Sequence, residues 1–125
     1  MGSRVVKAGE NMRVKRVYDK AEKFDGKRVL VDRLWPRGVS KKKAKIDIWA
    51  KELTPSNELR EWFHDDREKR FAEFSKRYSV ELRGKVEDAK EISKLQRYTL
   101  ITAVKDLEHS HIPTLVKFLE STKLI

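Results

Sequence analysis

Three short runs rich in β-forming residues end in side chains of the types that bind anions or transfer protons. The residues at these ends are Arg16 and Tyr18, then Asp32 and Arg33, and finally Lys105 and Asp106. If the runs are parallel strands, their carboxyl ends meet at one edge of a sheet, where α/β proteins form their ligand crevice. We therefore predict a shared pocket in which the basic groups hold an anion and the Asp32 or Asp106 carboxylate transfers a proton.

A stiff turn after the second run carries another arginine. Trp35 and Pro36 restrict the backbone before Arg37, and Gly38 permits close approach, so the planar guanidinium could be presented to a phosphate or carboxylate. Trp35 could stack on a ring of the ligand, although a single tryptophan more often packs in the core. The Asp-Arg pair before this turn has an equally good structural explanation, as a buried ion pair or a backbone cap.

Two histidines near the end of the chain, His109 and His111, are separated by one residue. Histidine titrates near neutrality, so His109 is a candidate general acid or base and His111 a candidate ligand contact. In an extended segment the same spacing can bind a divalent metal, with Asp106 or Glu108 as a third ligand. No complete metal signature is present, and histidines at a helix start often act as caps or surface groups. We therefore assign no metal ligand.

Several common kinds of active site are excluded by the sequence. The chain has no cysteine, and neither Ser40 nor Ser110 lies in a G-x-S-x-G elbow. A P-loop and a G-x-G-x-x-G turn are absent, so an NTPase or a Rossmann dinucleotide enzyme is not expected. The lack of cysteine also favours a reducing, cytoplasmic location.

The strands that position these side chains are predicted from apolar patterns. They are expected over 12–18, where β-formers alternate with charges, over 29–31 and over 99–104. The last two are apolar on both faces, as in the interior of a parallel sheet. Residues 19–27 are expected to form a turn. We predict an α/β fold with a small, mostly parallel sheet of three to five strands flanked by helices.

Helices are predicted in the segments between and after the strands. They are expected over 41–53, from 54–56 onward, from a capping pair of Asp65 and Glu68 to Gly84, over 86–98, and from Ser110 onward with Pro113 in the first turn. The third of them has a clear apolar stripe, formed by Phe71, Phe74, Tyr78 and Leu82.

Length and composition indicate one domain. At 125 residues the chain has the usual size of a single domain, which we assign to 12–125 after a flexible extension over 1–11. No apolar run approaches the roughly 18 residues that span a bilayer, so no membrane segment is expected. Charged residues make up 40% of the chain, a profile that resembles heat-adapted proteins.

The positive charge is concentrated in the first half. Residues 1–60 hold 17 Lys and Arg against 8 Asp and Glu, and residues 61–125 hold 13 against 12. Such a surface attracts small anions and nucleic acids through the same field. One hypothesis is a small enzyme or binding protein for a phosphate- or nucleotide-like anion. The alternative is a nucleic-acid-binding or regulatory module that uses Arg37, Lys45 and the three lysines at 41–43.

Ordered blocks along most of the chain resemble one known family. The blocks are 14–19, 28–40, 53–56, Leu59-Arg60, 62–65, and Lys105-Asp106 with His109 and His111. Together they resemble the YeaO-like family, domain of unknown function 488, over about residues 12–119. The resemblance implies an α/β fold and supplies no reaction. Relatives often have Tyr in place of Thr102 and Asn in place of Ser110, so no role of those side chains is carried over.

Overall fold

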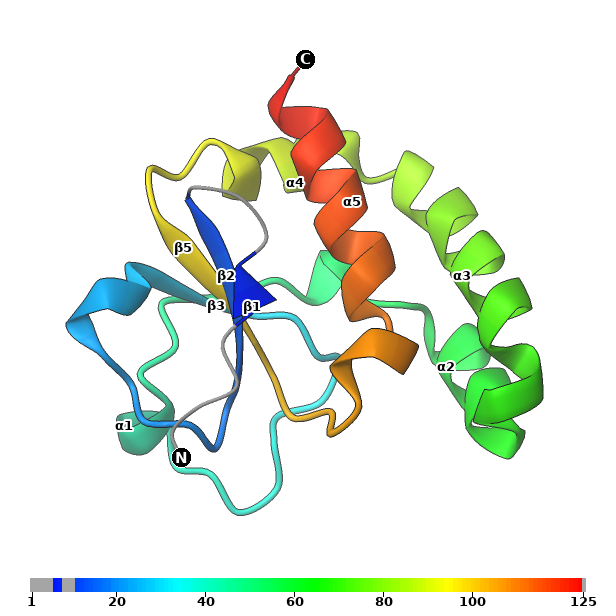
Figure 1. Ribbon diagram of the computed structural model, residues 1–125, viewed down its shortest axis with the longest axis horizontal. Coiled ribbons are helices and arrows are strands. Elements are labelled where there is room, and N and C mark those ends of the chain that lie inside the picture. The colour runs from blue at the N-terminus through cyan, green and yellow to red at the C-terminus, as the bar shows by residue number, and fades with distance from the viewer. Residues whose placement is uncertain (1–5, 8–10, 125) are drawn as a thin grey trace. The chain divides into compact units, whose positions relative to one another are not determined.

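The computed structural model describes residues 6–7 and 11–124. These residues contain five strands, five α-helices and three short 3₁₀ helices (Figure 1). They cluster into two compact units: the described residues up to Lys51 with Leu95–Lys105, and Glu52–Lys94 with residues 106–124. Within the described part of the chain, no helix is both long and apolar enough to cross a membrane.

The first unit contains a sheet of short strands. They are β1 (Val6–Lys7), β2 (Met12–Arg16), β3 (Lys27–Leu30), β4 (Ile48–Trp49) and β5 (Tyr98–Thr102). Their order across the sheet is β1-β2-β5-β3-β4, so β5 lies between β2 and β3. β1 is antiparallel to β2, and all other neighbours are parallel. The predicted α/β class and mostly parallel sheet are confirmed.

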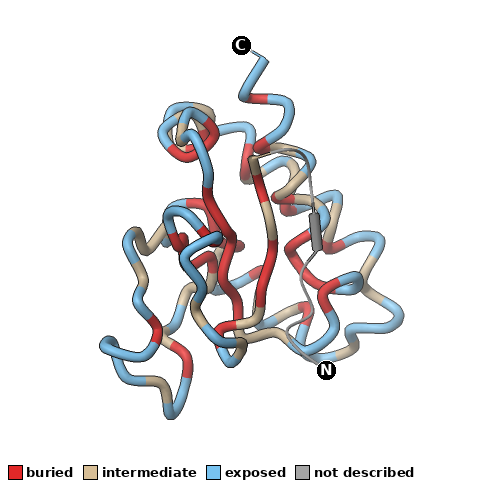
Figure 2. The backbone as a smooth tube through the Cα atoms, turned by 60° about the vertical axis from the view of Figure 1, so that its left-hand side comes forward, coloured by how far each residue is buried: buried red, intermediate tan, exposed pale blue. Residues whose placement is uncertain are grey.

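The middle of the sheet is fully buried. Val14, Leu100 and Val29 stand side by side in the register of β2, β5 and β3, and none is exposed. Figure 2 shows buried residues, in red, running along the strands and exposed ones, in pale blue, along the loops. β3 has β5 on one side and β4 on the other, so the predicted interior position of the run at 29–31 is confirmed.

The long connection from β3 to β4 packs on the sheet through apolar side chains. Leu30 and Ile101 are fully buried against Ala44 of α1 (Lys41–Ala44). Trp35 and Trp49 pack beside them, edge to face, with ring centroids 5.4 Å apart. The connection is therefore anchored by its own core side chains although it has little regular structure.

The helix predicted over 41–53 is wrong beyond its first turn. α1 ends at Ala44 because Lys45 adopts a left-handed conformation with φ of 49°. Ile46 and Ile48 flank Asp47 with a period of two, which is typical of a strand, and β4 then pairs with β3. Strand pairing satisfies this backbone within the sheet, whereas a short helix led by three lysines has no apolar stripe to stabilise it.

A cluster of buried charges joins β2 and β3 to the 3₁₀ helix η1 (Lys23–Asp25). Lys15 Nζ lies 3.0 Å from Asp25 Oδ1, and Arg28 Nη1 lies 2.6 Å from Asp25 Oδ2. The three residues are 0%, 1% and 4% exposed. Asp25 Oδ2 also accepts a hydrogen bond of 3.0 Å from the Glu22 N–H. One carboxylate thus compensates two buried cations and ties η1 to the sheet.

The second unit is helical. It contains α2 (Asn57–Asp65), α3 (Arg67–Arg83), α4 (Val86–Ser93), η3 (Leu107–His109) and α5 (Ile112–Lys123). The 3₁₀ helix η2 (Lys51–Leu53) begins with the last residue of the first unit and continues into the second. α5 packs against both α3 and α4. Phe74, Tyr78 and Leu82 of the predicted stripe are buried, and Phe71 is half-buried.

The helix boundaries follow the predicted caps with two corrections. The helix predicted to start at 54–56 is capped by Ser56, whose hydroxyl accepts a hydrogen bond from the Leu59 N–H at 3.2 Å. The cap of α3 is Asp66 and not Asp65, because Asp65 still belongs to α2 while Asp66 has an extended φ of −159°. The helix predicted over 86–98 ends at Ser93, since residues from Tyr98 onward enter the sheet.

The predicted extension over 1–11 lies mostly outside the described residues. Of its described residues, Val6 and Lys7 form β1 along β2. The assignment of 12–125 to one domain stays a prediction.

Candidate functional site

Asp32 follows β3 and is tied to the end of β5. Its Oδ1 accepts a hydrogen bond from the Thr102 hydroxyl at 2.6 Å, and its Oδ2 accepts one from the Ala103 N–H at 2.7 Å. The Asp32 carbonyl accepts a bond from the Trp49 indole N–H, also at 2.7 Å. Each carboxylate oxygen of this half-buried residue therefore holds a group of β5 or of the residue that follows it.

Arg16, the last residue of β2, holds the same segment from the other side of β5. Its Nε donates to the Val104 carbonyl at 2.9 Å, and its Nη2 donates to the Ala103 carbonyl at 3.1 Å. The guanidinium carbon lies 4.9 Å from the centre of the Tyr18 ring, which is 54% exposed. The strands on both sides of β5 thus supply the two side chains that fix residues 103–104.

Arg37 lies on an exposed turn. The Val39 N–H donates to the Pro36 carbonyl at 3.4 Å, and Gly38 has φ of 77°, as the third residue of a type II turn requires. Trp35 anchors this turn, because its indole N–H donates to the Val39 carbonyl at 2.7 Å and its ring packs in the core. The guanidinium of Arg37 is exposed beyond that anchor.

Two more basic residues follow the same strand ends. Arg33 is half-buried in the loop after β3, and Lys105 is exposed immediately after the segment that Arg16 and Asp32 hold. The carboxyl edge of the sheet therefore combines an internally bonded carboxylate with exposed cations. Such an edge attracts anions.

Asp106 and His109 form a pair in the second unit. Asp106 caps η3 by accepting the His109 N–H at 3.3 Å, and its Oδ2 lies 2.9 Å from His109 Nδ1. The hydrogen bond from the His109 ring lowers the pKa of Asp106 below its ordinary value of 3.8. His109 is exposed and packs edge-on against the Phe71 ring, with centroids 5.3 Å apart. The pair has the geometry of a proton-transfer dyad and also that of a helix cap.

His111 has a different environment from His109. It is 8% exposed, and its ring lies 6.3 Å from that of Tyr78 in the helical unit. Among residues 6–7 and 11–124, no group of three or more His, Asp or Glu side chains is placed to hold a metal ion.

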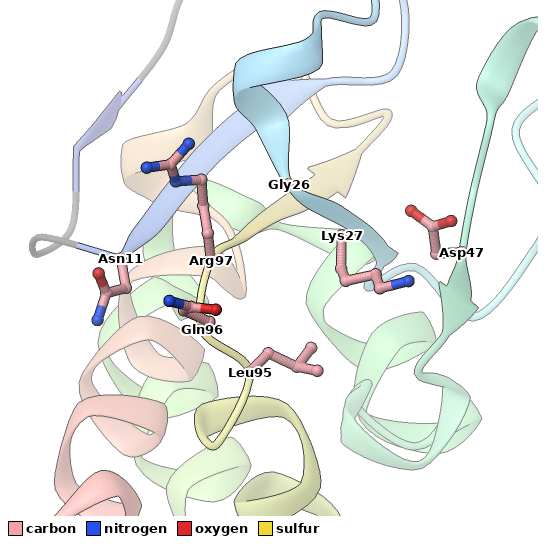
Figure 3. A pocket seen from close by; sticks show the side chains of 7 residues that line it. All are labelled: Asn11, Gly26, Lys27, Asp47, Leu95, Gln96 and Arg97. Atoms are coloured by element: carbon pink, nitrogen blue, oxygen red, sulfur yellow. The ribbon is translucent and has the colours of Figure 1, made fainter.

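A pocket at the opposite edge of the sheet was not predicted from the sequence. It has a volume of about 680 Å³ and lies where the four parallel strands begin. Its polar lining consists of Asn11 before β2, Lys27 at the start of β3, Asp47 before β4, and Gln96 and Arg97 before β5 (Figure 3). A sequence signal existed, because Asn11 and Gln96 are two of only three side-chain amides in the chain.

The described residues define a small α/β protein with a mostly parallel sheet. The chain belongs to the DUF488 family described as the inactive DUF488-N3 subclade, whose model matches residues 11–124. The resemblance to the YeaO-like DUF488 family is thereby confirmed.

Two relatives illustrate the extent of this similarity. The chain is 43% identical to the uncharacterized protein YeaO of Escherichia coli K12 over 114 residues, which are 89% of this chain and 98% of YeaO. It is 43% identical to the uncharacterized protein Rv3073c of Mycobacterium tuberculosis H37Rv over 111 residues, which are 86% of this chain and 92% of that protein. No solved structure shows a significant match.

Proposed function

We propose that this protein binds a phosphate-bearing anion at the carboxyl ends of its parallel strands without transforming it chemically. Nucleotides and sugar phosphates are the ligand class. The exposed Arg37 and Lys105 would contact the phosphate, and Arg33 and Tyr18 would line the same edge. Arg16 and Asp32 act as positioning residues for the segment that carries Lys105.

The bonding of Asp32 is the observation that carries this proposal. A general base must present a lone pair to its substrate and then accept a proton. One carboxylate oxygen of Asp32 accepts a hydrogen bond from the Thr102 hydroxyl at 2.6 Å, and the other accepts one from the Ala103 N–H at 2.7 Å. Protonation would weaken both bonds, so the carboxylate supports β5 better than it supports catalysis. The family description, which contains the word inactive, agrees with binding without turnover.

The second candidate is an enzyme in which Asp106 and His109 transfer a proton. It is favoured by the 2.9 Å distance between the Asp106 carboxylate and His109 Nδ1. An imidazole oriented in this way is a suitable general base. The exposure of both side chains, 60% and 64%, counts against it, because proton-transfer groups work best where water is excluded.

Calorimetric titration of the full chain with pyrophosphate, AMP and glucose 6-phosphate tests the proposed binding. We expect Arg37→Gln to raise the Kd of the ligand that binds by roughly tenfold, because a charge-assisted hydrogen bond is lost. Arg83→Gln makes the same charge change on an exposed residue at the end of α3 and serves as the matched control. The proposal would be overturned if Arg37→Gln and Arg83→Gln raised the Kd equally, or if no probe bound to the unchanged chain.

Phosphorus NMR of the same mixtures separates the two candidates. An unchanged ligand spectrum after prolonged incubation supports binding alone. Conversion of the ligand that disappears in His109→Gln would instead establish the enzyme.

A further inference from the structure

The pocket at the amino edge of the sheet offers hydrogen-bonding groups of several kinds. Its lining has two amides, Asn11 and Gln96, each with a donor and an acceptor, together with the carboxylate of Asp47. Figure 3 shows the two amides on one side of the pocket and Lys27 with Asp47 on the other. Amides and carboxylates in this combination match the mixed donor and acceptor edge of a nucleobase.

The pocket is also held rigid by its backbone. The Tyr98 N–H donates to the Asn11 carbonyl at 3.0 Å, and the Lys27 N–H donates to the Arg97 carbonyl at 3.1 Å. Gly26 has φ of 67°, and a Cβ at this position would lie 2.5 Å from the Arg97 carbonyl oxygen. Only glycine allows this close approach, so the strand starts that carry the polar groups are fixed relative to one another.

Asp47 is fixed in a similar way at the far side of the pocket. Its N–H donates to the Arg28 carbonyl at 2.9 Å, and its Oδ2 accepts the Arg28 N–H at 2.8 Å. The carboxylate is therefore oriented before any ligand arrives. Preorganised polar groups lose less entropy when a ligand binds.

A pair of arginines lies against an exposed aromatic ring beside the pocket. The guanidinium carbon of Arg97 is 4.7 Å from the centre of the Phe24 ring, and that of Arg13 is 4.0 Å from it. Phe24 is 52% exposed. Both guanidiniums lie against the same ring, so an anion beside that ring would be attracted by two positive charges. Aromatic rings and guanidinium planes are also the surfaces on which proteins stack unpaired bases.

We propose that this amino-edge pocket binds a nucleotide, either free or as one unit of a single-stranded nucleic acid. The base is read by Asn11, Gln96 and Asp47. The phosphate lies near Arg97 and Arg13, beside the Phe24 ring. This site is distinct from the carboxyl-edge anion site proposed above, and it places nucleic-acid recognition away from the lysines at 41–43.

The three side-chain amides of the chain make a direct test possible. In a ¹H,¹⁵N correlation spectrum of the full chain, the side-chain NH₂ groups of Asn11, Gln96 and Asn57 give three pairs of signals. Asn57 lies in α2, in the other unit, and serves as the internal control. The probes are the four ribonucleoside monophosphates, a mixed-sequence single-stranded RNA octamer, the corresponding DNA octamer, and inorganic phosphate.

We expect the Asn11 and Gln96 signals to shift while the Asn57 signals stay in place. Shifts with the monophosphates support a free nucleotide as ligand, and shifts only with an octamer support a single strand. The inference is overturned if the Asn11 and Gln96 signals stay in place with every probe. It is also overturned if inorganic phosphate alone reproduces the whole pattern.

Substitutions test the arginine and ring contacts in a second way. Arg97→Gln is expected to raise the Kd of the bound probe about tenfold, and Phe24→Leu is expected to raise it about fivefold. Arg83→Gln, which makes the same charge change as Arg97→Gln, should stay within twofold. If Arg97→Gln and Phe24→Leu also stay within twofold of the unchanged chain, the Phe24 and arginine contacts do not hold a ligand and the inference fails.

Discussion

Replacing Asp25 by asparagine tests whether the buried charge cluster stabilises the first unit. The two side chains have nearly the same shape, so packing is preserved and the charge is removed. Lys15, which is 0% exposed, then keeps the Glu22 carboxylate, whose side chain is 57% exposed, while Arg28, which is 4% exposed, loses its ion pair with Asp25. The asparagine would also turn an NH₂ group toward one of the two cations.

Asp25→Asn is expected to lower the free energy of unfolding by a large amount. Removing one partner of a buried ion pair costs about 3–5 kcal/mol, because the remaining charge is buried without compensation. Whole domains are stable by only about 5–15 kcal/mol, so Asp25→Asn should remove a large fraction of the free energy of unfolding. Urea denaturation at neutral pH, followed by circular dichroism, measures this change, with an unchanged m-value expected.

Matched variants keep the interpretation specific. Asp65→Asn removes a carboxylate whose side chain is 77% exposed and 3.5 Å from Arg70, and it should cost less than about 1 kcal/mol. Lys15→Met should cost less than Asp25→Asn, because Asp25 keeps its bond to Arg28 at 2.6 Å. The double variant should be more stable than the sum of the two single losses predicts. A loss below about 1 kcal/mol for Asp25→Asn would refute the reasoning.

The same cluster gives the stability a pH dependence. Burial raises the pKa of Asp25, but hydrogen bonds from Glu22, Lys15 and Arg28 outweigh it and hold the pKa below the ordinary 3.8. A carboxyl group whose pKa is depressed by folding stabilises the protein above its unfolded pKa and loses that contribution as the pH falls through the folded pKa. The stability gap between the unchanged chain and Asp25→Asn should therefore be constant near neutrality and narrow below about pH 4.

Three further predictions concern single residues. Gly26→Ala should destabilise the protein by more than about 2 kcal/mol, because the added Cβ would lie 2.5 Å from the Arg97 carbonyl oxygen. Gly38→Ala has a similar φ but open space around the added Cβ, so it should cost about 1 kcal/mol. Urea denaturation compares the free energies of unfolding of the two variants. The Asp106 carboxyl should titrate below 3.8 by ¹³C NMR because of its bond to His109, and a normal midpoint would contradict that contact. His64 should titrate below 6.5 by NMR, because desolvation and neighbouring arginines disfavour its charged form, and a midpoint above 6.5 would contradict this.

The sheet could be predicted from the sequence because its strands are marked by local pattern. The runs at 29–31 and 99–104 are apolar and β-branched, and these residues fill the buried interior of a parallel sheet. Short-range pattern failed where backbone conformation decided the outcome. The sequence around Lys45 does not predict a left-handed residue. The left-handed conformation of Lys45 nevertheless ends α1 and allows β4 to form.

The candidate sites were predictable only in part, for a related reason. Arg16 and Asp32 could be placed at strand ends, but their hydrogen bonds to residues 103–104 depend on which strands are neighbours. The buried charges of Lys15 and Arg28 go against the rule that charged side chains are exposed, so pattern alone assigns them to the surface. The amino-edge pocket draws on four strand starts that are distant in sequence.

The place of β5 in the sheet has a consequence for how the chain is made. Among the strands that the structure describes, β5 comes last in the sequence, yet it lies between β2 and β3. During translation, the edges of β2 and β3 that pair with β5 therefore keep unpaired backbone N–H and C=O groups until residues 98–102 have left the ribosome. Open strand edges invite pairing with other chains, and long-range parallel pairing is slow. The first unit can therefore complete its sheet only after β5 has been made, and until then its open strand edges are exposed to aggregation.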